Sequence, residues 1–437
     1  MARFEVLVGR MQMAVRKPVP ARPASMPKIA MASFVGGLME WYDFYIFATA
    51  SAIVFGQLFF PSGNRLVSTM AAFGAFAAGF LARPVGGLVF GHIGDRIGRK
   101  ASLVMTLLII GVGTFLIGVL PTWQQGGLLA PILLVVLRVA QGVGLGGEYG
   151  GAALMTIEHA PIGQRGFWGS LPQAASPAGL LLASGVFSLM SLLPRDAFLA
   201  WGWRVPFLAS IVMLVVGLFI RLRIEETPEF EAIRDSVRHA VPAMDLARTA
   251  KRRVLLALGA RLGETTSGNM IKSFGLSYVT VQLGLSRQTA LSALLATSVV
   301  ALLVTPLFGW ISDRVGRREM YMAGAASAAV LAFPFFWLLE ARTPGAVWIG
   351  FVVAYTFGPT LMLSVQATFF SELFSAGMRY TGLSVAYQGS AVLGGFVPLI
   401  AISLLAEAGG EPWLVATFLC VTSLVSLGCT IAAGRGS

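Results

Sequence analysis

Apolar residues run along almost the whole chain in windows of about 20, the length that an α-helix needs to cross the hydrocarbon core of a membrane. Short breaks that contain charged residues, proline or glycine separate twelve such windows. The pattern therefore predicts an all-α polytopic membrane protein. The predicted spans are 30–60, 68–91, 101–120, 128–157, 166–193, 203–222, 253–282, 289–311, 319–339, 345–370, 381–406 and 412–433.

One long polar stretch divides these spans into six and six. Its mixed charge is typical of a solvated linker and not of a span. We expect the basic N-terminal tail to be disordered. The predicted divisions are a cytoplasmic tail at 1–28, a six-helix bundle at 29–222, a cytoplasmic linker at 223–252, a second six-helix bundle at 253–433 and a short cytoplasmic tail at 434–437.

Two motifs occur once in each half of the chain. G-H-I-G-D-R-I-G-R-K at 91–100 returns as G-W-I-S-D-R-V-G-R-R at 309–318, an offset of 218 residues. A glutamate seven residues before an arginine follows the fourth span and returns 214 residues later, after the tenth. Repeats at nearly one offset predict two equivalent six-helix halves in parallel orientation, an arrangement typical of transporters.

The composition excludes several classes of protein. Of the 437 residues, 56% are hydrophobic and 12% are charged, and the mean hydropathy is +0.77. Soluble domains are roughly 25% charged. So little sequence lies outside the spans that it leaves no room for an enzyme domain or a nucleotide-binding domain. We therefore expect no enzyme activity and no cofactor, and transport energy from a gradient.

The net charge of +12 would suggest nucleic acid in a soluble protein, but its placement is that of a membrane protein. Of the 32 Lys and Arg residues, 23 fall on one side of the predicted topology and 5 on the other. The positive-inside rule then places both termini in the cytoplasm of a bacterial inner membrane. Cys420 and Cys429 project from opposite faces of one helix, so we expect neither a disulfide between them nor a metal site.

Ionisable residues inside the spans mark functional positions, because each is costly in lipid. They concentrate in the first helix of each predicted three-helix unit, whereas the interiors of the third helices have none. We expect the first helices to line a central cavity and the third helices to face lipid. The charges concerned are Glu40, Asp43, Arg138, Glu148, Arg261, Glu264 and Lys272.

Asp43 and Arg138 both lie near the middle of the bilayer, so a salt bridge between them is expected. A carboxylate among apolar groups takes up a proton readily, as proton coupling requires. Asp43 is the first candidate for that role, followed by Glu40, Glu148 and Glu264. Arg138 is the candidate anchor for an anionic substrate, although a bridge that only joins helices remains open.

Further polar side chains in the spans are candidates for substrate contact, although such residues also join helices. The glycine run that follows Arg138 lacks the G-K-[ST] ending of a phosphate loop, so phosphate binding is excluded. The substrate-binding candidates beside Arg138 are Gln141, Tyr149, Asn269, Lys272, Tyr387 and Gln388.

The D-R-x-G-R-[KR] turns are so short that their glycines must permit a tight reversal. Their basic residues can pair with nearby glutamates and hold the halves in one conformation, which is the requirement for a gate. The alternative is that these charges only fix the topology. The gating candidates are Asp95, Arg96, Arg99, Glu158, Arg165, Asp313, Arg314, Arg317, Glu372 and Arg379.

Several motifs together resemble the metabolite:proton symporter family of the major facilitator superfamily, in its shikimate-transporter-like branch. They are E-W-Y-D-F-Y at 40–45, the A-R-P-V-G-G segment that begins at 82, R-V-A-Q-G-V-G-L-G-G-E-Y-G-G-A-A-L at 138–154, W-G-W-R-V-P-F at 201–207, E-E-T-P-E-F at 225–230 and M-R-Y-T-G at 378–382. The resemblance implies the major facilitator fold and proton-driven uptake of shikimate, dicarboxylates, oxoacids, or zwitterions such as proline and betaine.

The prediction is proton-coupled import of a small organic acid by alternating access, with the protein expected to act as a monomer. Lys272 is a departure, because the family pattern does not require a positive charge well inside span seven. Three alternatives remain open: uptake of a zwitterion, proton-coupled efflux of an amphipathic compound, and a membrane sensor that does not transport.

Overall fold

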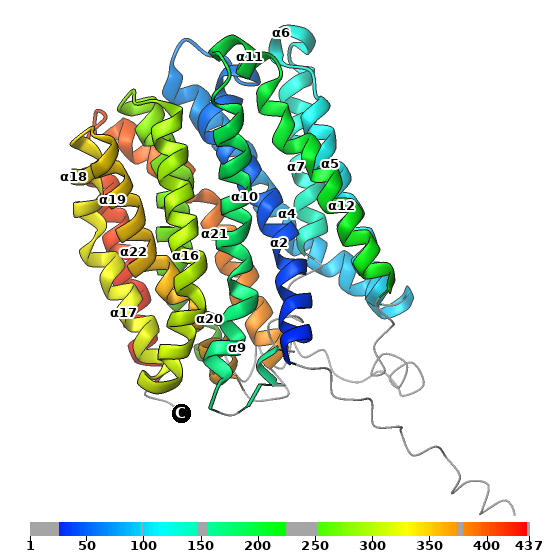
Figure 1. Cartoon of the computed structure of the whole chain (residues 1–437), viewed down its shortest axis with the longest axis vertical. Helices are drawn as coiled ribbons and strands as arrows, with labels where there is room; N and C mark the ends of the chain where they lie inside the picture. The colour runs from blue at the N-terminus through cyan, green and yellow to red at the C-terminus, as the bar shows by residue number, and fades with distance from the viewer. Residues whose placement is uncertain are drawn as a thin grey trace, which may run out of the picture.

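The structure is a computed structural model that describes residues 26–97, 99–146, 156–158, 160–161, 163–223, 251–374 and 379–434. Within these ranges the regular secondary structure is helical throughout, and the long helices run side by side in one bundle (Figure 1). The predicted all-α class is therefore confirmed.

The N-terminal half begins with α2 and ends with α12. Its long helices α4 and α7 pack closely together, and α10 packs against α2. The helices are α2 (Met26–Ala50), α3 (Gly56–Leu58), α4 (Arg65–Ile97), α5 (Arg99–Val119), α6 (Trp123–Gly126), α7 (Leu129–Gly146), α9 (Arg165–Gln173), α10 (Ala175–Met190), α11 (Arg195–Ala200) and α12 (Val205–Arg223).

The C-terminal half begins with α15 and ends with α22. The segment between the halves, 224–250, and the tails 1–25 and 435–437 lie outside the described residues, so the predicted linker and tails remain predictions. The helices are α15 (Lys251–Asn269), α16 (Arg287–Val315), α17 (Arg317–Val330), α18 (Ala332–Glu340), α19 (Pro344–Tyr355), α20 (Leu361–Leu373), α21 (Arg379–Glu407) and α22 (Trp413–Ala433).

Among the described residues, eight helical segments are long and apolar enough to cross a membrane. A ninth span is formed by α17 and α18 together, which meet at a bend of 44°, and Val104–Val119 of α5 is a shorter apolar helix. The two remaining predicted spans correspond to helical stretches at 26–58 and 251–282, whose interiors contain the charged side chains of Glu40, Asp43, Arg261, Glu264 and Lys272. The structure is thus consistent with twelve spans.

Three helical spans contain a short π-helical stretch. Ser51–Phe55 follows α2, Met270–Gly275 follows α15, and Thr356–Thr360 joins α19 to α20. A π-turn inserts an extra residue into a helix and is frequent at functional sites. These stretches all fall in first helices of the predicted three-helix units.

Glycines allow the backbones of α4 and α7 to touch. A Cβ atom placed on Gly86 would lie 1.9 Å from the carbonyl oxygen of Val143, and one on Gly142 would lie 1.9 Å from the carbonyl oxygen of Gly79. Small residues permit such close approach of helices in membranes. This contact fixes the position of α7, which carries Arg138.

The repeated turn motif of the C-terminal half also depends on a glycine. Gly316 joins α16 to α17 with a φ of 110°, a conformation that side chains with a Cβ rarely adopt. The prediction that glycine permits this tight reversal is confirmed for the second copy of the motif. The side chains of 91–103, which include the first copy, lie outside the described part of the chain.

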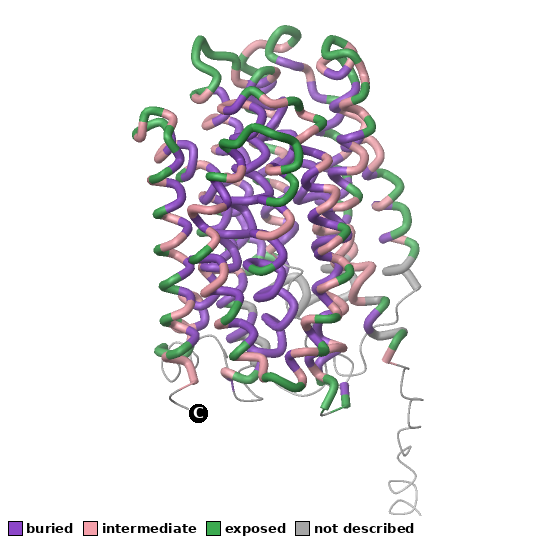
Figure 2. The backbone as a smooth tube through the Cα atoms, turned by 60° about the vertical axis from the view of Figure 1, so that its left-hand side comes forward, coloured by how far each residue is buried: buried purple, intermediate pink, exposed green. Residues whose placement is uncertain are grey.

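The outer surface of the bundle is apolar where the third helices of the units face outward. On α5, the exposed side chains Leu108, Val112 and Leu116 recur at every fourth position, and α12 exposes Val212 and Val216 in the same way. In Figure 2 buried residues follow the inside of the bundle, while exposed residues gather at its ends and outer faces. A stripe of this kind fits contact with lipid chains.

Candidate functional site

The N-terminal and C-terminal halves enclose a small cavity, here called the central cavity. Helix α2 contributes Glu40, Trp41 and Phe44, and α4 contributes Phe80 and Arg83. The C-terminal half completes it with polar residues of the seventh and eleventh spans. These residues include Arg261, Glu264, Thr265, Asn269, Lys272 and Tyr387.

The central cavity has a volume of about 40 Å³, enough for a few water molecules and too small for a metabolite. Three basic and two acidic side chains line it: Arg83, Arg261 and Lys272 against Glu40 and Glu264. With all five ionised, the lining carries one net positive charge. An arrangement of this kind favours a ligand with a single negative charge.

Arg261 is the centre of a network in the C-terminal half. Its Nη1 donates to the Tyr387 carbonyl oxygen and to Ser390 Oγ, both at 2.6 Å, and its Nη2 lies 3.7 Å from Glu264 Oε2. The guanidinium also covers the Tyr387 ring, 3.5 Å from its centroid. With its amide oriented to satisfy both neighbours, Gln366 donates to Glu264 Oε2 at 3.2 Å and accepts from Arg261 Nε at 3.2 Å.

Asn269 and Lys272 present polar atoms to the central cavity. Asn269 donates through Nδ2 to the Gly394 carbonyl oxygen at 3.1 Å, while its buried Oδ1 has no hydrogen-bond partner among the described residues. Lys272 is 8% exposed, and its Nζ donates to the Tyr45 hydroxyl at 3.0 Å. These two side chains therefore retain hydrogen-bonding capacity for a ligand.

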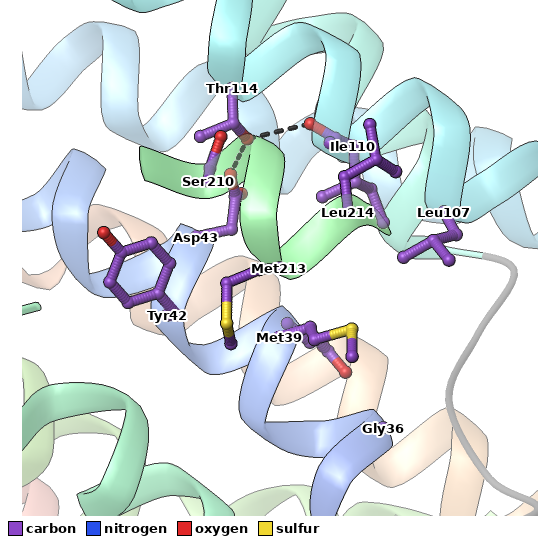
Figure 3. Close-up of a pocket in the computed structure, with 12 residues that line it drawn as sticks. Gly36, Met39, Tyr42, Asp43, Leu107, Ile110, Thr114, Ser210, Met213 and Leu214 are labelled. Atoms are coloured by element: carbon purple, nitrogen blue, oxygen red, sulfur yellow. Dashed lines mark hydrogen bonds between the residues drawn. The ribbon is translucent and has the colours of Figure 1, made fainter. Parts of the chain in front are cut away.

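A second polar cluster lies inside the N-terminal half. Asp43 Oδ1 accepts from Gln141 Nε2 at 3.1 Å. It also accepts from the Thr114 hydroxyl (Figure 3). Asp43 Oδ2 lies 3.8 Å from Arg138 Nη1, which donates to Gln141 Oε1 at 3.2 Å. The predicted Asp43–Arg138 pair is thus present, and both side chains are buried.

Aromatic rings surround the guanidinium of Arg138. Its Cζ lies 4.3 Å from the ring centroid of Phe47 and 5.4 Å from that of Phe76. Gly79 on α4 leaves the space for this side chain, since a Cβ atom there would lie 2.8 Å from Arg138 Nε. Only Asp43 provides a carboxylate within 4 Å among the described residues, so its ionised form balances a buried charge.

Asp43 also lines a separate small cavity, here called the lateral cavity, between α2, α5 and α12. Its volume is about 30 Å³, and its walls are mostly apolar, with Met39, Leu107 and Met213 among them (Figure 3). Glu40 lines both the lateral and the central cavity. It therefore lies between the buried Asp43 cluster and the space between the halves.

The structure separates some of the predicted substrate residues from others. Asn269, Lys272 and Tyr387 line the central cavity, whereas Arg138 and Gln141 belong to the Asp43 cluster. Gln388 is half-buried and lies outside the lining of both cavities. Glu148 and Tyr149 fall outside the described residues, and the first helix of the second unit, α7, does not line the central cavity.

Sequence reasoning missed several residues at this site. Arg83 is an ionisable side chain inside the second span, so the criterion applied to the other spans could have found it. Arg261 was recognised as a charge within a span but received no role. The contribution of Thr114, Tyr45 and Gln366 depends on contacts between helices distant in sequence, which no local pattern reveals.

Three of the predicted gating residues, Asp313, Arg317 and Glu372, meet at the end of the bundle where α16 turns into α17. Asp313 Oδ1 accepts from the Gly166 backbone N–H at 2.7 Å and Oδ2 from that of Phe167 at 2.9 Å, at the start of α9. A carboxylate at a helix N-terminus is favourable. Arg317 contacts Asp313 at 3.1 Å and pairs with Glu372. Asp313 thus joins the two halves.

The remaining gating candidates take no described part in this contact. Arg314 is exposed, and its guanidinium covers the Trp310 ring of the same helix. Glu158 is exposed, and Arg165 is half-buried at the first position of α9. The side chains of Asp95, Arg96, Arg99 and Arg379 lie outside the described part.

The halves also meet at the opposite end of the bundle. Arg65 donates to the Thr280 carbonyl oxygen at 3.3 Å, and Gln288 donates to Ser188 Oγ at 3.0 Å. Arg287 covers the Phe198 ring, 3.9 Å from its centroid. Contacts at both ends account for the small volume of the central cavity.

Comparison with known proteins assigns the chain to a family. The model of the family described as "Sugar (and other) transporter" matches residues 28–244 and 229–432, which together span both halves. The chain belongs to this transporter family of the major facilitator superfamily. It is a polytopic membrane transporter of small molecules and not an enzyme, as predicted.

Curated relatives and solved structures agree with this assignment. The transporter is 39% identical to the shikimate transporter of Escherichia coli K12 over 91% of this chain and 92% of that protein. It is 32% identical to the proline/betaine transporter of the same strain, over 94% of this chain and 85% of that protein. The structure of a D-xylose-proton symporter superposes on this chain with a TM-score of 0.69 and 19% sequence identity. The superposition covers 92% of this chain and 97% of the symporter, so the two share a fold.

Within the described part of the transporter, no group of three or more His, Cys, Asp or Glu side chains is placed to hold a metal ion. The two cysteines are free and half-buried on α22, away from both cavities. The chemistry available at the site is therefore that of charges, hydroxyls and amides.

Removing the Asp313 carboxylate is expected to loosen the contact between the halves at the α16–α17 end. Asp313→Ala deletes the acceptor for two backbone donors, and hydrogen bonds to a charged group contribute about 1.5–3 kcal/mol each. We expect a cysteine at Ala391, in a chain with Cys420 and Cys429 replaced by serine, to react at least about tenfold faster with a thiol reagent applied from this side.

Arg314→Ala is the matched control, because the contacts that the structure describes for the neighbouring Arg314 are with Trp310 of its own helix. It should leave the rate of cysteine labelling unchanged. Equal labelling rates in the Asp313 variant and the parent chain would contradict the assignment of Asp313 as a gate.

Proposed function

We propose that this transporter imports a small organic acid together with protons by alternating access. The observation that supports the proposal is the central cavity, where side chains of both halves bring together three cations, two carboxylates and the open acceptor of Asn269. A site at the junction of the halves is the one place that each half can uncover in turn.

We assign the anion contact to Arg83, Arg261 and Lys272, with Asn269 and Tyr387 as hydrogen-bonding partners for the rest of the substrate. Arg138, the anchor expected from the sequence, lies outside the lining of this cavity, so we place it in the proton site instead. The net positive charge of the lining favours a monoanion over a neutral sugar.

We assign the coupling proton to Asp43. The carboxylate is buried against Arg138, and Gln141 and Thr114 hold its Oδ1 atom. Protonation would remove the partner of a buried guanidinium, which is strongly unfavourable unless the surroundings rearrange. That penalty links the charge of Asp43 to the conformation of the N-terminal half. Glu40 and Glu264 line the cavity as secondary candidates.

The charge asymmetry of the loops supports a cytoplasmic location for both termini and for the α16–α17 end. On that orientation, the Asp313 contact forms the inner gate, and the contacts of Arg65 and Gln288 form the outer one. A bacterial inner membrane is the proposed location, in keeping with the likeness to an inner membrane metabolite transport protein of Escherichia coli K12.

Transport by purified protein in liposomes tests the proposal. A panel of labelled shikimate, dicarboxylates and oxoacids should include at least one compound that accumulates inside. At a fixed membrane potential, acidifying the outside should raise the initial rate of uptake, because it raises the occupancy of the proton site. Uptake that is indifferent to external pH would refute proton coupling.

Zwitterion uptake is the second candidate, favoured by the likeness to the proline/betaine transporter. Competition by proline or betaine in the same assay separates the two. Efflux of an amphipathic compound would instead appear as resistance in an overexpressing strain. A sensor would alter transcription upon deletion without any change in uptake.

A further inference from the structure

The ammonium group of Lys272 lies among three aromatic rings, here called the aromatic box: Trp41, Tyr45 and Tyr355. Its Nζ is 4.7 Å from the ring centroid of Tyr45, 5.5 Å from that of Tyr355 and 5.8 Å from that of Trp41. All three distances fall within the range of about 6 Å at which a cation is attracted to an aromatic face. The box is therefore a cation site that the chain fills with its own lysine.

No carboxylate balances this charge at short range. In the part of the chain that the structure describes, no carboxylate oxygen lies within 4 Å of Lys272 Nζ, whereas Arg261 has Glu264 and Arg138 has Asp43. The hydrogen bond to the Tyr45 hydroxyl uses one of three donors of the ammonium group. The other donors are available to an anion in the central cavity.

The box forms between the two halves of the transporter. Trp41 and Tyr45 lie on α2, and Tyr45 makes a hydrogen bond of 2.6 Å with Ser176 of α10, also in the N-terminal half. Lys272 lies in the π-helical stretch Met270–Gly275, and Tyr355 directly precedes the stretch Thr356–Thr360. The irregular turns of two spans thus position the lysine and one wall of its box.

We propose that Lys272 sets the charge selectivity of the substrate site. Its ammonium group occupies the place that a quaternary ammonium headgroup would take in an aromatic box, and repels such a headgroup, while its free donors bind the carboxylate of an anionic substrate. This inference rests on the proposed function, since it concerns the substrate class of the same cavity. It selects organic acids over betaine-like zwitterions.

Calorimetric binding to the purified full-length protein tests the inference, with shikimate and glycine betaine as probes. We expect the unmodified protein to bind shikimate and not glycine betaine. Lys272→Ala empties the box, so shikimate affinity should fall at least about tenfold, the effect of losing a charged hydrogen bond. The same variant should gain measurable binding of glycine betaine.

Two further variants keep the test interpretable. Lys272→Arg retains the positive charge and should still exclude glycine betaine. Lys251→Ala removes an exposed lysine at the start of the same helical span and should change neither affinity. Gel filtration of each variant as a single symmetrical peak shows that it is folded, and Lys272→Gln replaces the alanine variant should that one aggregate.

The outcomes separate the two proposals. Unchanged shikimate affinity in the neutral variants, or no gain of glycine betaine binding, overturns the selectivity role of Lys272. Absence of shikimate and other organic acid binding to the unmodified protein overturns the proposed function instead. Binding of glycine betaine to the unmodified protein overturns the selectivity role of Lys272, whether or not an organic acid also binds.

Discussion

Asp43→Asn is expected to abolish proton-driven accumulation of substrate while leaving substrate exchange intact. The amide retains an oxygen that can accept from Gln141 and Thr114, but it neither gains nor loses a proton. An inward gradient of about one pH unit supplies about 1.4 kcal/mol per proton, enough for tenfold accumulation at one proton per anion. Liposomes with the unmodified protein should reach that ratio, and those with the variant should only equilibrate.

Counterflow of labelled against unlabelled substrate provides the internal check, because it requires a folded, mobile protein but no proton gradient. Asp196→Asn, in the exposed first turn of α11, serves as the matched control and should accumulate normally. Tenfold accumulation by the Asp43 variant would move the coupling site elsewhere, with Glu40 as the next carboxylate to test.

Gly86→Ala is expected to cause a large loss of stability in the N-terminal half. The added methyl group would meet the Val143 carbonyl oxygen at 1.9 Å, and a backbone atom of α7 cannot move without shifting that helix. Overpacking typically costs about 1–3 kcal/mol, and this contact belongs at the upper end. We expect a clear fall in the melting temperature of the detergent-solubilised protein.

Gly74→Ala on the same helix gives the comparison, since a Cβ atom there meets nothing within 4 Å. Alanine is the better helix former by up to about 1 kcal/mol, so this variant should melt at the same temperature or slightly higher. Equal melting temperatures for the two variants would show that α4 and α7 tolerate separation at Gly86.

The fold was predictable because hydrophobic windows and repeated motifs depend only on local sequence. The ends of the described helices agree with the predicted spans within a few residues at most positions, as at Trp413–Ala433 against 412–433. The 44° bend between α17 and α18 has no counterpart in the hydrophobic pattern. The π-helical stretches were not foreseen either, since no residue type marks them.

The sequence predicted how deep in the membrane each site residue lies, but not which way its side chain points. Counting residues along a span correctly placed Asp43 beside Arg138, because the rise per residue is constant. It could not tell which neighbouring helices each side chain faces. Glu40 and Asp43 share part of a helix face, yet Glu40 reaches the central cavity and the carboxylate of Asp43 contacts α5 and α7. The rotation of α2 within the bundle decides this difference.

The partners of the buried cations Arg261 and Lys272 bear on the step of the proposed cycle in which the protein changes conformation without substrate. On the proposed cycle, the protein without substrate passes through a conformation in which its binding groups are buried. A buried charge without a partner is unfavourable there and would slow this step. In this structure Arg261 is paired with Glu264 and a backbone carbonyl oxygen. Lys272 contacts the rings of the aromatic box and the Tyr45 hydroxyl. On the proposed transport cycle, an incoming anion competes with Glu264 for Arg261, which weakens binding and eases release, while the remaining donors of Lys272 stay available to it.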